Sequence, residues 1–390
     1  MNECARQMND AHPAGRRFSP RNRVAGVMPL RQLVLIPGTG EINHGPRSNA
    51  DNRRLECLAQ PADAIHFRFR AAADDRNRDS SRRLRGARQG RQDGRTAVRG
   101  DTHFRPRLRA VLNALVGLDV LSKDGEGRYA LTPESATFLV AGKPTFHGAF
   151  FLLTSEPMLA AWCHLYQVVR NGRPVRRINL EQDGVNFFLQ FVEDIFPIHY
   201  PAAVELGNTL GVPEAAGPLS VLDVAAGSGV WSIALAQRSE HVRVTAVDWP
   251  GVIPVTKKIA ARCAVIDRYE FVAGDLLEVD FGRDHAIATL GHILHSEGEE
   301  RSRRLIKKVF DALAPEGTIA IAEILVDPER KIAVPALIFA VNMLVNSEHG
   351  DTFSLDEIST WLHDAGFESV RTIEAPGLAP RLILATKPIR

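Results

Sequence analysis

The sequence predicts an α/β protein whose C-terminal part is a doubly wound, mostly parallel sheet. After Pro218 the pattern changes to alternating apolar strands and amphipathic helices, and the first strand runs into a glycine turn that opens a helix. Only 375–380 separates the last two strands, too few residues for a parallel crossover of about a dozen, so these strands are expected to run antiparallel. The expected strands lie near 219–225, 242–248, 269–273, 286–292, 317–325, 368–374 and 381–387, and the expected helices near 229–238, 252–263, 299–313 and 355–365.

Residues 1–103 are expected to be disordered or poorly packed, because no sustained apolar period runs through them. The net charge of the chain is only +2, yet residues 1–100 hold 20 Arg, no Lys and 10 acidic residues, which leaves the rest mildly acidic. This segment lacks the lysines and interleaved aromatic residues of nucleic-acid-binding arms, which argues against nucleic acid as a partner. A third interpretation is translation of a GC-rich gene in a wrong reading frame.

Residues 104–211 predict a helical region that begins as a partial winged helix. Apolar residues recur on one helix face from Leu108 to Val116, a short strand pair follows, and Thr132 and Pro133 supply the N-cap and first position of a second helix. The pattern from 146 to 211 is helical and rich in aromatic residues. Such a module serves dimerisation or packing, and DNA binding would need a basic recognition face that 108–121 barely supplies.

Cysteine spacing and hydropathy exclude several classes of protein. The four cysteines lie far apart with no C-x-x-C pair, which argues against a zinc site or a disulfide framework and favours reduced thiols in the cytoplasm; no metal is expected. The longest apolar stretch, 332–345, is interrupted by Pro335 and Asn342 and falls short of the ~20 residues of a bilayer span. We expect it to form a buried helix, and we expect neither an export signal nor a membrane partner.

The segment 220–235 runs from a strand through a glycine turn into an amphipathic helix. Gly227 and Gly229 permit a tight turn and a close approach of a ligand to the backbone at the helix N-terminus. Asp248 ends the next strand about 20 residues later, where an acidic side chain meets ribose hydroxyls in dinucleotide-binding folds. This spacing predicts a Rossmann-like site for a nucleoside-bearing cofactor.

Two features favour S-adenosylmethionine over a nicotinamide dinucleotide. Asp223 lies in the strand before the turn, and Ser232 stands where a dinucleotide site has its third glycine. An acidic residue beside the turn would repel a pyrophosphate, but it suits the cationic amino-acid end of S-adenosylmethionine. Asp275, at the end of the third strand, is placed to accept a hydrogen bond from an adenine amino group.

At these motifs the chain resembles the bacterial and plant small-molecule O-methyltransferases, class I enzymes with a winged-helix dimerisation domain before a seven-stranded methyltransferase domain. The resemblance covers about residues 105–390, and the family's Asp-Val-Gly-Gly-Gly-Thr-Gly motif is Asp-Val-Ala-Ala-Gly-Ser-Gly at 223–229. It implies a homodimer paired through its N-terminal helices and a cofactor domain over 212–390. The implied cofactor residues are Asp223, Ala225, Gly227, Gly229, Asp248, Trp249, Asp275 and Leu276.

The resemblance also implies a general base. The family's His-Asp-Trp segment matches His295-Ser-Glu, which makes His295 the candidate base, and the family's orienting carboxylate matches Glu323. Two positions depart from the pattern: Ser296 replaces the aspartate, and Thr352 replaces a second orienting glutamate. The alternatives are that His295 caps or precedes the 299–313 helix and that Glu323 is an ordinary buried acid. His292, the rival base, is expected to pack in the sheet.

The apolar helix around 335–345 is expected to roof an acceptor pocket, with Phe339, Asn342 and Met343 as candidate contacts. This lining favours methyl transfer to a hydroxyl of a small hydrophobic metabolite, aromatic or polyketide-like. The alternatives are a C- or N-methyltransferase that acts by positioning, a nicotinamide reductase, and a winged-helix regulator that binds DNA.

Overall fold

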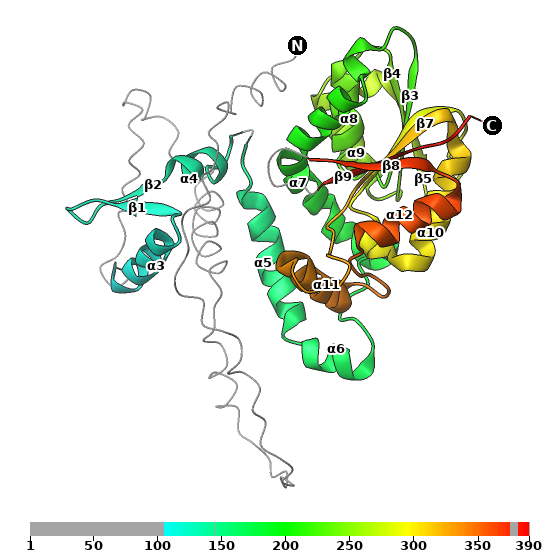
Figure 1. Cartoon of the computed structure of the whole chain (residues 1–390). Coiled ribbons are helices and arrows are strands. Elements are labelled where there is room, and N and C mark those ends of the chain that lie inside the picture. The colour runs from blue at the N-terminus through cyan, green and yellow to red at the C-terminus, as the bar shows by residue number, and fades with distance from the viewer. Residues whose placement is uncertain (1–104, 144, 375–380, 390) are drawn as a thin grey trace.

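The computed structural model describes residues 105–143, 145–374 and 381–389, so the expectations for residues 1–103 lie outside the described residues. The expected α/β class is confirmed, with a seven-stranded sheet in the order β5-β4-β3-β6-β7-β9-β8 (Figure 1). Its strands are β3 (Leu219–Val224), β4 (Val242–Asp248), β5 (Tyr269–Ala273), β6 (His285–Gly291), β7 (Leu313–Ala322), β8 (Glu368–Ile373) and β9 (Leu382–Thr386).

Strand directions follow the lengths of the connections. β3 pairs in parallel with β4 and β6, because helices cross between these strands. β9 pairs antiparallel with β8, as expected from the short 375–380 link, and it also pairs antiparallel with β7. The helices that cover the sheet are α8 (Val230–Arg238), α9 (Ile253–Arg262), α10 (Leu294–Ala312) and α12 (Leu355–Ala365), with single turns η3 (Val212–Glu214) and η4 (Ile266–Arg268).

Apolar side chains alternate between two core layers, one on each face of the sheet. Val221 of β3 packs with α8 and α9 on one face, and the next residue, Leu222, packs with α10 and α12 on the other. α7 (Glu181–Thr209) joins the first of these layers through residues such as Phe196 and Leu206. The carboxyl ends of β3, β4, β5 and β6 thus meet at one edge between two packed layers, where an open α/β sheet binds its ligands.

The helix α10 begins earlier than the sequence indicates. Its first turn starts at Leu294, and Gly298, with φ 76°, breaks the helical geometry before the long amphipathic part that the sequence predicts from 299. The backbone N–H groups of Leu294 and His295 donate to the Glu323 carboxylate, at 2.8 and 3.4 Å, which satisfies two groups that a helix start leaves without partners. This long-range contact explains a turn that has no local apolar signal.

The N-terminal described region has the expected order of helix, strand pair and helix: α3 (Arg105–Gly117), β1 (Leu121–Lys123), β2 (Tyr129–Leu131) and α4 (Pro133–Phe138). Thr132 caps α4 as expected, because its side chain accepts from the Ser135 N–H. α5 (Gly148–Trp162) and α6 (Leu165–Asn171) follow and contact α11 (Val334–Asn346) (Figure 1). The domain boundary at 211/212 stays a prediction.

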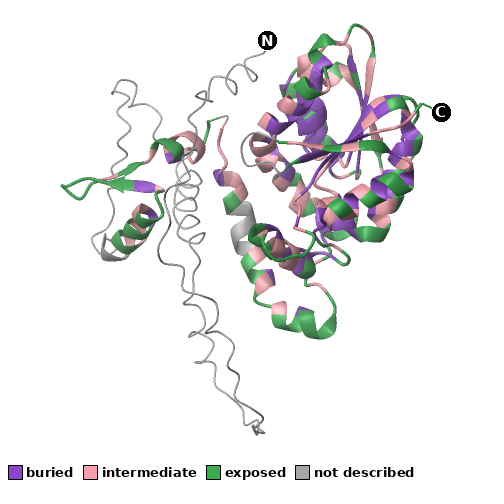
Figure 2. Ribbon diagram, in the orientation of Figure 1, coloured by how far each residue is buried: buried purple, intermediate pink, exposed green. Residues whose placement is uncertain are grey.

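The expectation of a buried helix over 332–345 is wrong for one of its faces. Val345 is buried against Ala161 of α5 and Val168 of α6, whereas Val334 and Ile338 are 55% and 54% exposed. Figure 2 colours the described residues by burial, and the buried residues concentrate in and around the sheet. The sequence concealed this difference, because the two polar residues of α11, Asn342 and Asn346, are buried while apolar residues face solvent, the reverse of the usual amphipathic pattern. Among the residues that the structure describes, no helix is both long and apolar enough to cross a bilayer.

Candidate active site

The glycine turn lies between β3 and α8 and needs three left-handed backbone conformations. Ala225, Gly227 and Gly229 have φ values of 55°, 54° and 72°. A Cβ atom on Gly227 would lie 3.1 Å from Cγ1 of Val192, so the two glycines combine unusual dihedrals with close packing. The turn leads into α8 at Val230, and it places the N-terminus of that helix at the edge of the sheet.

Asp248 ends β4 next to this turn and is bound to it. Its carboxylate accepts from the Gly227 N–H and from the Trp249 N–H, both at 2.7 Å. Burial raises the pKa of Asp248 to about 6, although these two backbone donors favour the charged form. The carboxylate therefore holds the turn and keeps lone pairs that could accept from ribose hydroxyls.

Asp223 lies beneath the turn instead of facing the edge. It is 1% exposed, and its two oxygens accept from the hydroxyls of Ser232 and Thr289. Burial raises the pKa of Asp223 to about 6. Asp223 and Ser232, the two residues that the sequence singled out, are thus joined by a hydrogen bond between β3 and α8. A direct contact of Asp223 with the cofactor stays a prediction.

Asp275 follows β5 along the same edge. Leu276, its neighbour in the cofactor set, is 6% exposed and belongs to the core, whereas the Asp275 side chain is 41% exposed. The Asp275 carboxylate accepts from the Leu277 N–H at 2.8 Å and pairs with Arg301 of α10 at 2.9 Å. Sequence reasoning missed Arg301, because the pairing joins two elements and leaves no local motif.

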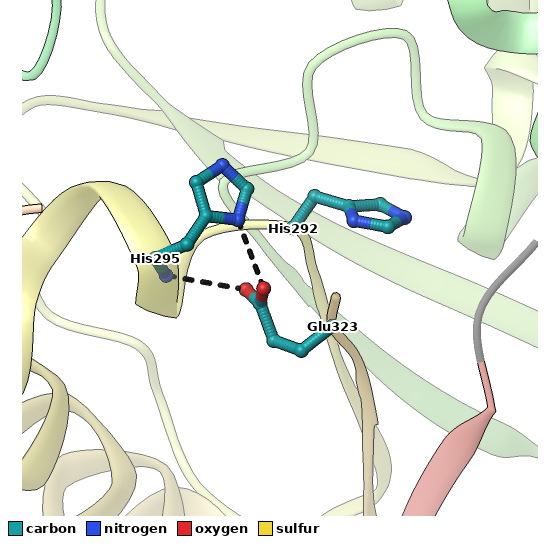
Figure 3. A group of neighbouring side chains, drawn as sticks. All are labelled: His292, His295 and Glu323. Atoms are coloured by element: carbon teal, nitrogen blue, oxygen red, sulfur yellow. Dashed lines mark hydrogen bonds and ion pairs between the residues drawn. The ribbon is translucent and has the colours of Figure 1, made fainter. Parts of the chain in front are cut away.

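His295 and Glu323 form a close pair at the carboxyl ends of β6 and β7. Nδ1 of His295 lies 2.9 Å from Oε2 of Glu323, and Figure 3 shows the other ring nitrogen turned away from this carboxylate. Burial by itself would raise the pKa of Glu323, but the adjacent His295 ring and hydrogen bonds lower it below the usual value. An ionised Glu323 selects the His295 tautomer with the proton on Nδ1 and leaves Nε2 as a proton acceptor.

His292 lies just past β6 in a left-handed conformation, with φ 59°. Its ring centroid is 4.4 Å from that of His199 on α7, and its Nε2 is buried without a partner in the described residues. Burial, and then the neighbouring His199, lower the pKa of His292 well below its usual value, so it is neutral. His292 was expected to pack in the sheet, but its ring instead lies beside that of the candidate base. A strained backbone conformation at His292 maintains this position.

The group His292, His295 and Glu323 is also compact enough to be considered for a metal. One potential ligand atom from each lies within 4.8 Å of the others. In this structure, however, His295 and Glu323 already satisfy one another through a hydrogen bond. The expectation of no metal stays a prediction.

The three candidate acceptor contacts on α11 occupy different environments. Phe339 meets the His295 ring edge to face, with centroids 4.9 Å apart. Asn342 is 6% exposed, and its Oδ1 accepts from Trp162 at 3.3 Å and Asn346 at 3.0 Å, while Met343 is 3% exposed. Phe339 is therefore the one of the three that touches the base.

The second acid of the family pattern has no counterpart at Thr352. This residue is fully buried, and its hydroxyl has no partner among the described residues. Its segment still holds the base, because the Asp351 N–H donates to the His295 carbonyl at 3.0 Å. His295 thus depends on Glu323 as its carboxylate partner.

Comparisons with known proteins agree with this arrangement. Residues 209–368 match the family model of the O-methyltransferase domain. The chain is 28% identical over 274 residues to 3-hydroxy-5-methyl-1-naphthoate 3-O-methyltransferase from Streptomyces sahachiroi, which covers 68% of this chain and 78% of that protein. It is 27% identical to the tetracenomycin polyketide synthesis 8-O-methyl transferase from Streptomyces glaucescens, over 69% and 79% of the two chains.

A solved structure assigned as an O-methyltransferase from Nostoc punctiforme superposes with a TM-score of 0.65 and 27% identity, over 72% of this chain and 84% of that chain. The sheet order, the glycine turn with its acidic residues at successive strand ends, and the His295–Glu323 pair all fit the same assignment. Residues 209–368 therefore form the S-adenosylmethionine-dependent O-methyltransferase domain of this enzyme.

Proposed function

We propose that this enzyme transfers the methyl group of S-adenosylmethionine to a hydroxyl of a small aromatic or polyketide-like metabolite, with His295 as general base. The observation that carries the proposal is the pair of His295 and the buried Glu323, which leaves one imidazole nitrogen able to accept a proton. The proposed site of the adenosyl cofactor is the same edge of the sheet, and it is supported by the glycine turn after β3 and by Asp248 and Asp275 at the ends of β4 and β5.

The bound cofactor supplies an electrophilic methyl group. Methyl transfer from that group to an acceptor oxygen would release the hydroxyl proton, and Nε2 of His295, the ring nitrogen not bonded to Glu323, is the group that would accept it. Glu323 stabilises the resulting imidazolium through Nδ1–H. The protein also aligns oxygen, carbon and sulfur and excludes water, and α11 with Phe339 covers the base for that purpose.

The acceptor class follows from the lining and from relatives. Phe339 is an aromatic neighbour of His295. Among the described partners of His295, Glu323 is the charged one. Two relatives are named for methylation of a naphthoate and of a polyketide product. A planar, uncharged aromatic hydroxyl compound fits both observations.

Two measurements test the proposal. Calorimetric titration of folded protein with S-adenosylhomocysteine should show binding, and incubation of naphthols and hydroxylated polyketides with methyl-labelled S-adenosylmethionine should give a labelled methyl ether. Replacing His295 by Ala should lower turnover by about 10²–10⁴. An absence of binding by a folded sample would remove the proposal, while unchanged turnover of the His295→Ala variant would leave a methyltransferase that acts by positioning alone.

We also propose a homodimer, on the basis of exposed apolar side chains on α5, α6 and α11. Tyr166 and Val169 of α6 are 71% and 67% exposed, and Ile338 of α11 is 54% exposed, which is unusual for a surface that stays in water. Light scattering should give twice the chain mass, and Val169→Glu with Ile338→Glu should shift it toward the monomer. A monomeric wild-type protein at micromolar concentration would contradict this proposal.

A cytoplasmic location is proposed from the cysteine pattern, because the four cysteines lie far apart in the sequence with no C-x-x-C pair. A second candidate function, methylation of carbon or nitrogen by positioning, is favoured by Ser296 and Thr352, which replace two acidic residues of the family pattern. Product analysis by mass spectrometry separates ethers from C- and N-methyl compounds. A DNA-binding regulator would instead give a gel shift with steep salt dependence.

A further inference from the structure

Glu297, Arg301 and Asp275 form a chain of charges between α10 and the end of β5. The Nε–H of Arg301 donates to Glu297 Oε2 at 2.5 Å, and its Nη2 donates to both Asp275 oxygens, at 2.9 and 3.2 Å. Glu297 is 6% exposed, so one end of the chain is fixed in the protein, while the Asp275 side chain at the other end is 41% exposed. The guanidinium plane is thereby held by an internal acid and presents its other edge to Asp275.

The lone pairs of Asp275 are unevenly used. Oδ1 accepts from the Leu277 N–H at 2.8 Å and from Arg301 at 3.2 Å, whereas Oδ2 accepts only from Arg301 in the described residues, at 2.9 Å. A carboxylate oxygen can accept two hydrogen bonds, so Oδ2 keeps one open position. The Asp275 side chain is 41% exposed, so a ligand can approach this carboxylate.

The location of this open position identifies the ligand group. β5 is the neighbour of β4, and the Gly274 N–H donates to the Asp248 carbonyl at 3.0 Å, which ties the ends of the two strands together. Asp248 is bound to the glycine turn and is proposed to meet the ribose, so Asp275 lies one strand farther out, where the base of a bound nucleoside would be. An exocyclic amino group donates to a carboxylate, whereas a carbonyl at the same ring position repels it.

We propose that Arg301 is a positioning residue for the cofactor, which orients the Asp275 carboxylate so that Oδ2 accepts from the 6-amino group of adenine and rejects a 6-oxo base. The inference rests on the proposed function, because it needs an adenosyl cofactor in this crevice. It assigns Arg301 and Glu297 a role beyond stabilising the surface, where partly exposed ion pairs such as Arg301–Asp275 contribute little. Glu297 acts through Arg301, across the break at Gly298.

The test is calorimetric binding of S-adenosylhomocysteine and of its deaminated analogue, S-inosylhomocysteine, to the full chain. The wild-type protein should bind the adenosyl compound about 10- to 100-fold more tightly, as expected for loss of a hydrogen bond to a charged group. Asp275→Ala and Arg301→Ala should both reduce this ratio to within a few-fold of one. Glu297→Gln, which keeps the shape of the side chain, should give an intermediate ratio.

Arg303→Ala is the matched control, because Arg303 lies on the same helix and pairs with Glu299 and Asp364 without touching Asp275. It should keep the wild-type ratio, and Arg301→Lys serves if Arg301→Ala does not fold. A wild-type ratio in the Arg301 and Asp275 variants, with normal S-adenosylhomocysteine binding, overturns this inference alone. Failure of the wild-type protein to bind S-adenosylhomocysteine would instead remove the proposed function.

Discussion

Replacing Glu323 by Gln isolates the role of the carboxylate, because the two side chains have nearly the same size and Glu323 is only 2% exposed. One oxygen of the Glu323 carboxylate accepts a hydrogen bond from the His295 ring, and the other accepts from the Leu294 N–H. A glutamine has only one accepting oxygen. If that oxygen stays with the backbone donors, the amide N–H₂ group faces Nδ1 of His295 and forces the ring proton onto Nε2.

The expected result is a base in the wrong tautomer. Turnover should fall by about 10²–10⁴, which corresponds to about 2.7–5.4 kcal/mol of transition-state stabilisation. Binding of S-adenosylhomocysteine should change little, because the described contacts of Glu323 do not include the glycine turn. The loss should be smaller for acceptors of low pKa, such as nitrophenols, because these are already ionised and need no base.

Nitrogen-15 spectra of the histidine rings provide a readout that needs no acceptor. The His295 signal should report a proton on Nδ1 in the wild-type protein and on Nε2 in Glu323→Gln. Glu299→Gln, an exposed acid on the same helix, is the control and should change neither the tautomer nor the rate. An unchanged tautomer together with unchanged turnover would refute the reasoning, and an equal loss for strongly and weakly acidic acceptors would point to a distorted site.

Three further predictions concern the sheet edge. Gly291→Ala should lower the free energy of unfolding by about 1–3 kcal/mol, since the added Cβ would lie 2.0 Å from Nε1 of the buried Trp231; an unchanged midpoint in urea would contradict this packing. Affinity for S-adenosylhomocysteine should fall by up to about tenfold per pH unit below pH 6, because burial raises the pKa of Asp248 to about 6 and the carboxylate loses its charge below that pH. Calorimetry from pH 8 to 5 that shows a constant affinity would exclude this coupling. Ser232→Ala should cost about 1–3 kcal/mol of stability, measured by thermal unfolding, because it leaves an oxygen of the buried Asp223 without its donor, and a neutral effect would show that this bond is dispensable.

The strand and helix pattern after Pro218 was readable from the sequence, since buried parallel strands and amphipathic helices impose different apolar periods on the chain. The seven strands lie within a few residues of the expected ranges, and the antiparallel pairing of β8 with β9 followed from connection length alone. The same reasoning was wrong for one face of the 332–345 helix, because its Asn342 is buried while the apolar Val334 and Ile338 are exposed, the reverse of the usual amphipathic pattern.

The site was predictable where residues adjacent in sequence act together, as in the glycine turn with Gly227 and Gly229. It was not predictable where the chemistry depends on partners from different elements. Arg301 lies 26 positions from Asp275 and Glu323 lies 28 positions from His295, so their hydrogen bonds have no periodic signature. The left-handed backbone at His292 was also not predictable, because a histidine in a strand-like sequence carries no signal for a positive φ.

The sequence by itself thus determined the order of the elements, the glycine turn after β3 and, through a family resemblance, the identity of the candidate base. Only the tertiary structure decided that Asp223 is enclosed by Ser232 and Thr289, that Asp275 is held by Arg301, and that Glu323 holds both the His295 ring and the helix start that carries it. The physical reason is that local backbone preferences act over a few residues, whereas the orientation and charge of a buried polar group depend on whatever the fold brings within hydrogen-bonding distance.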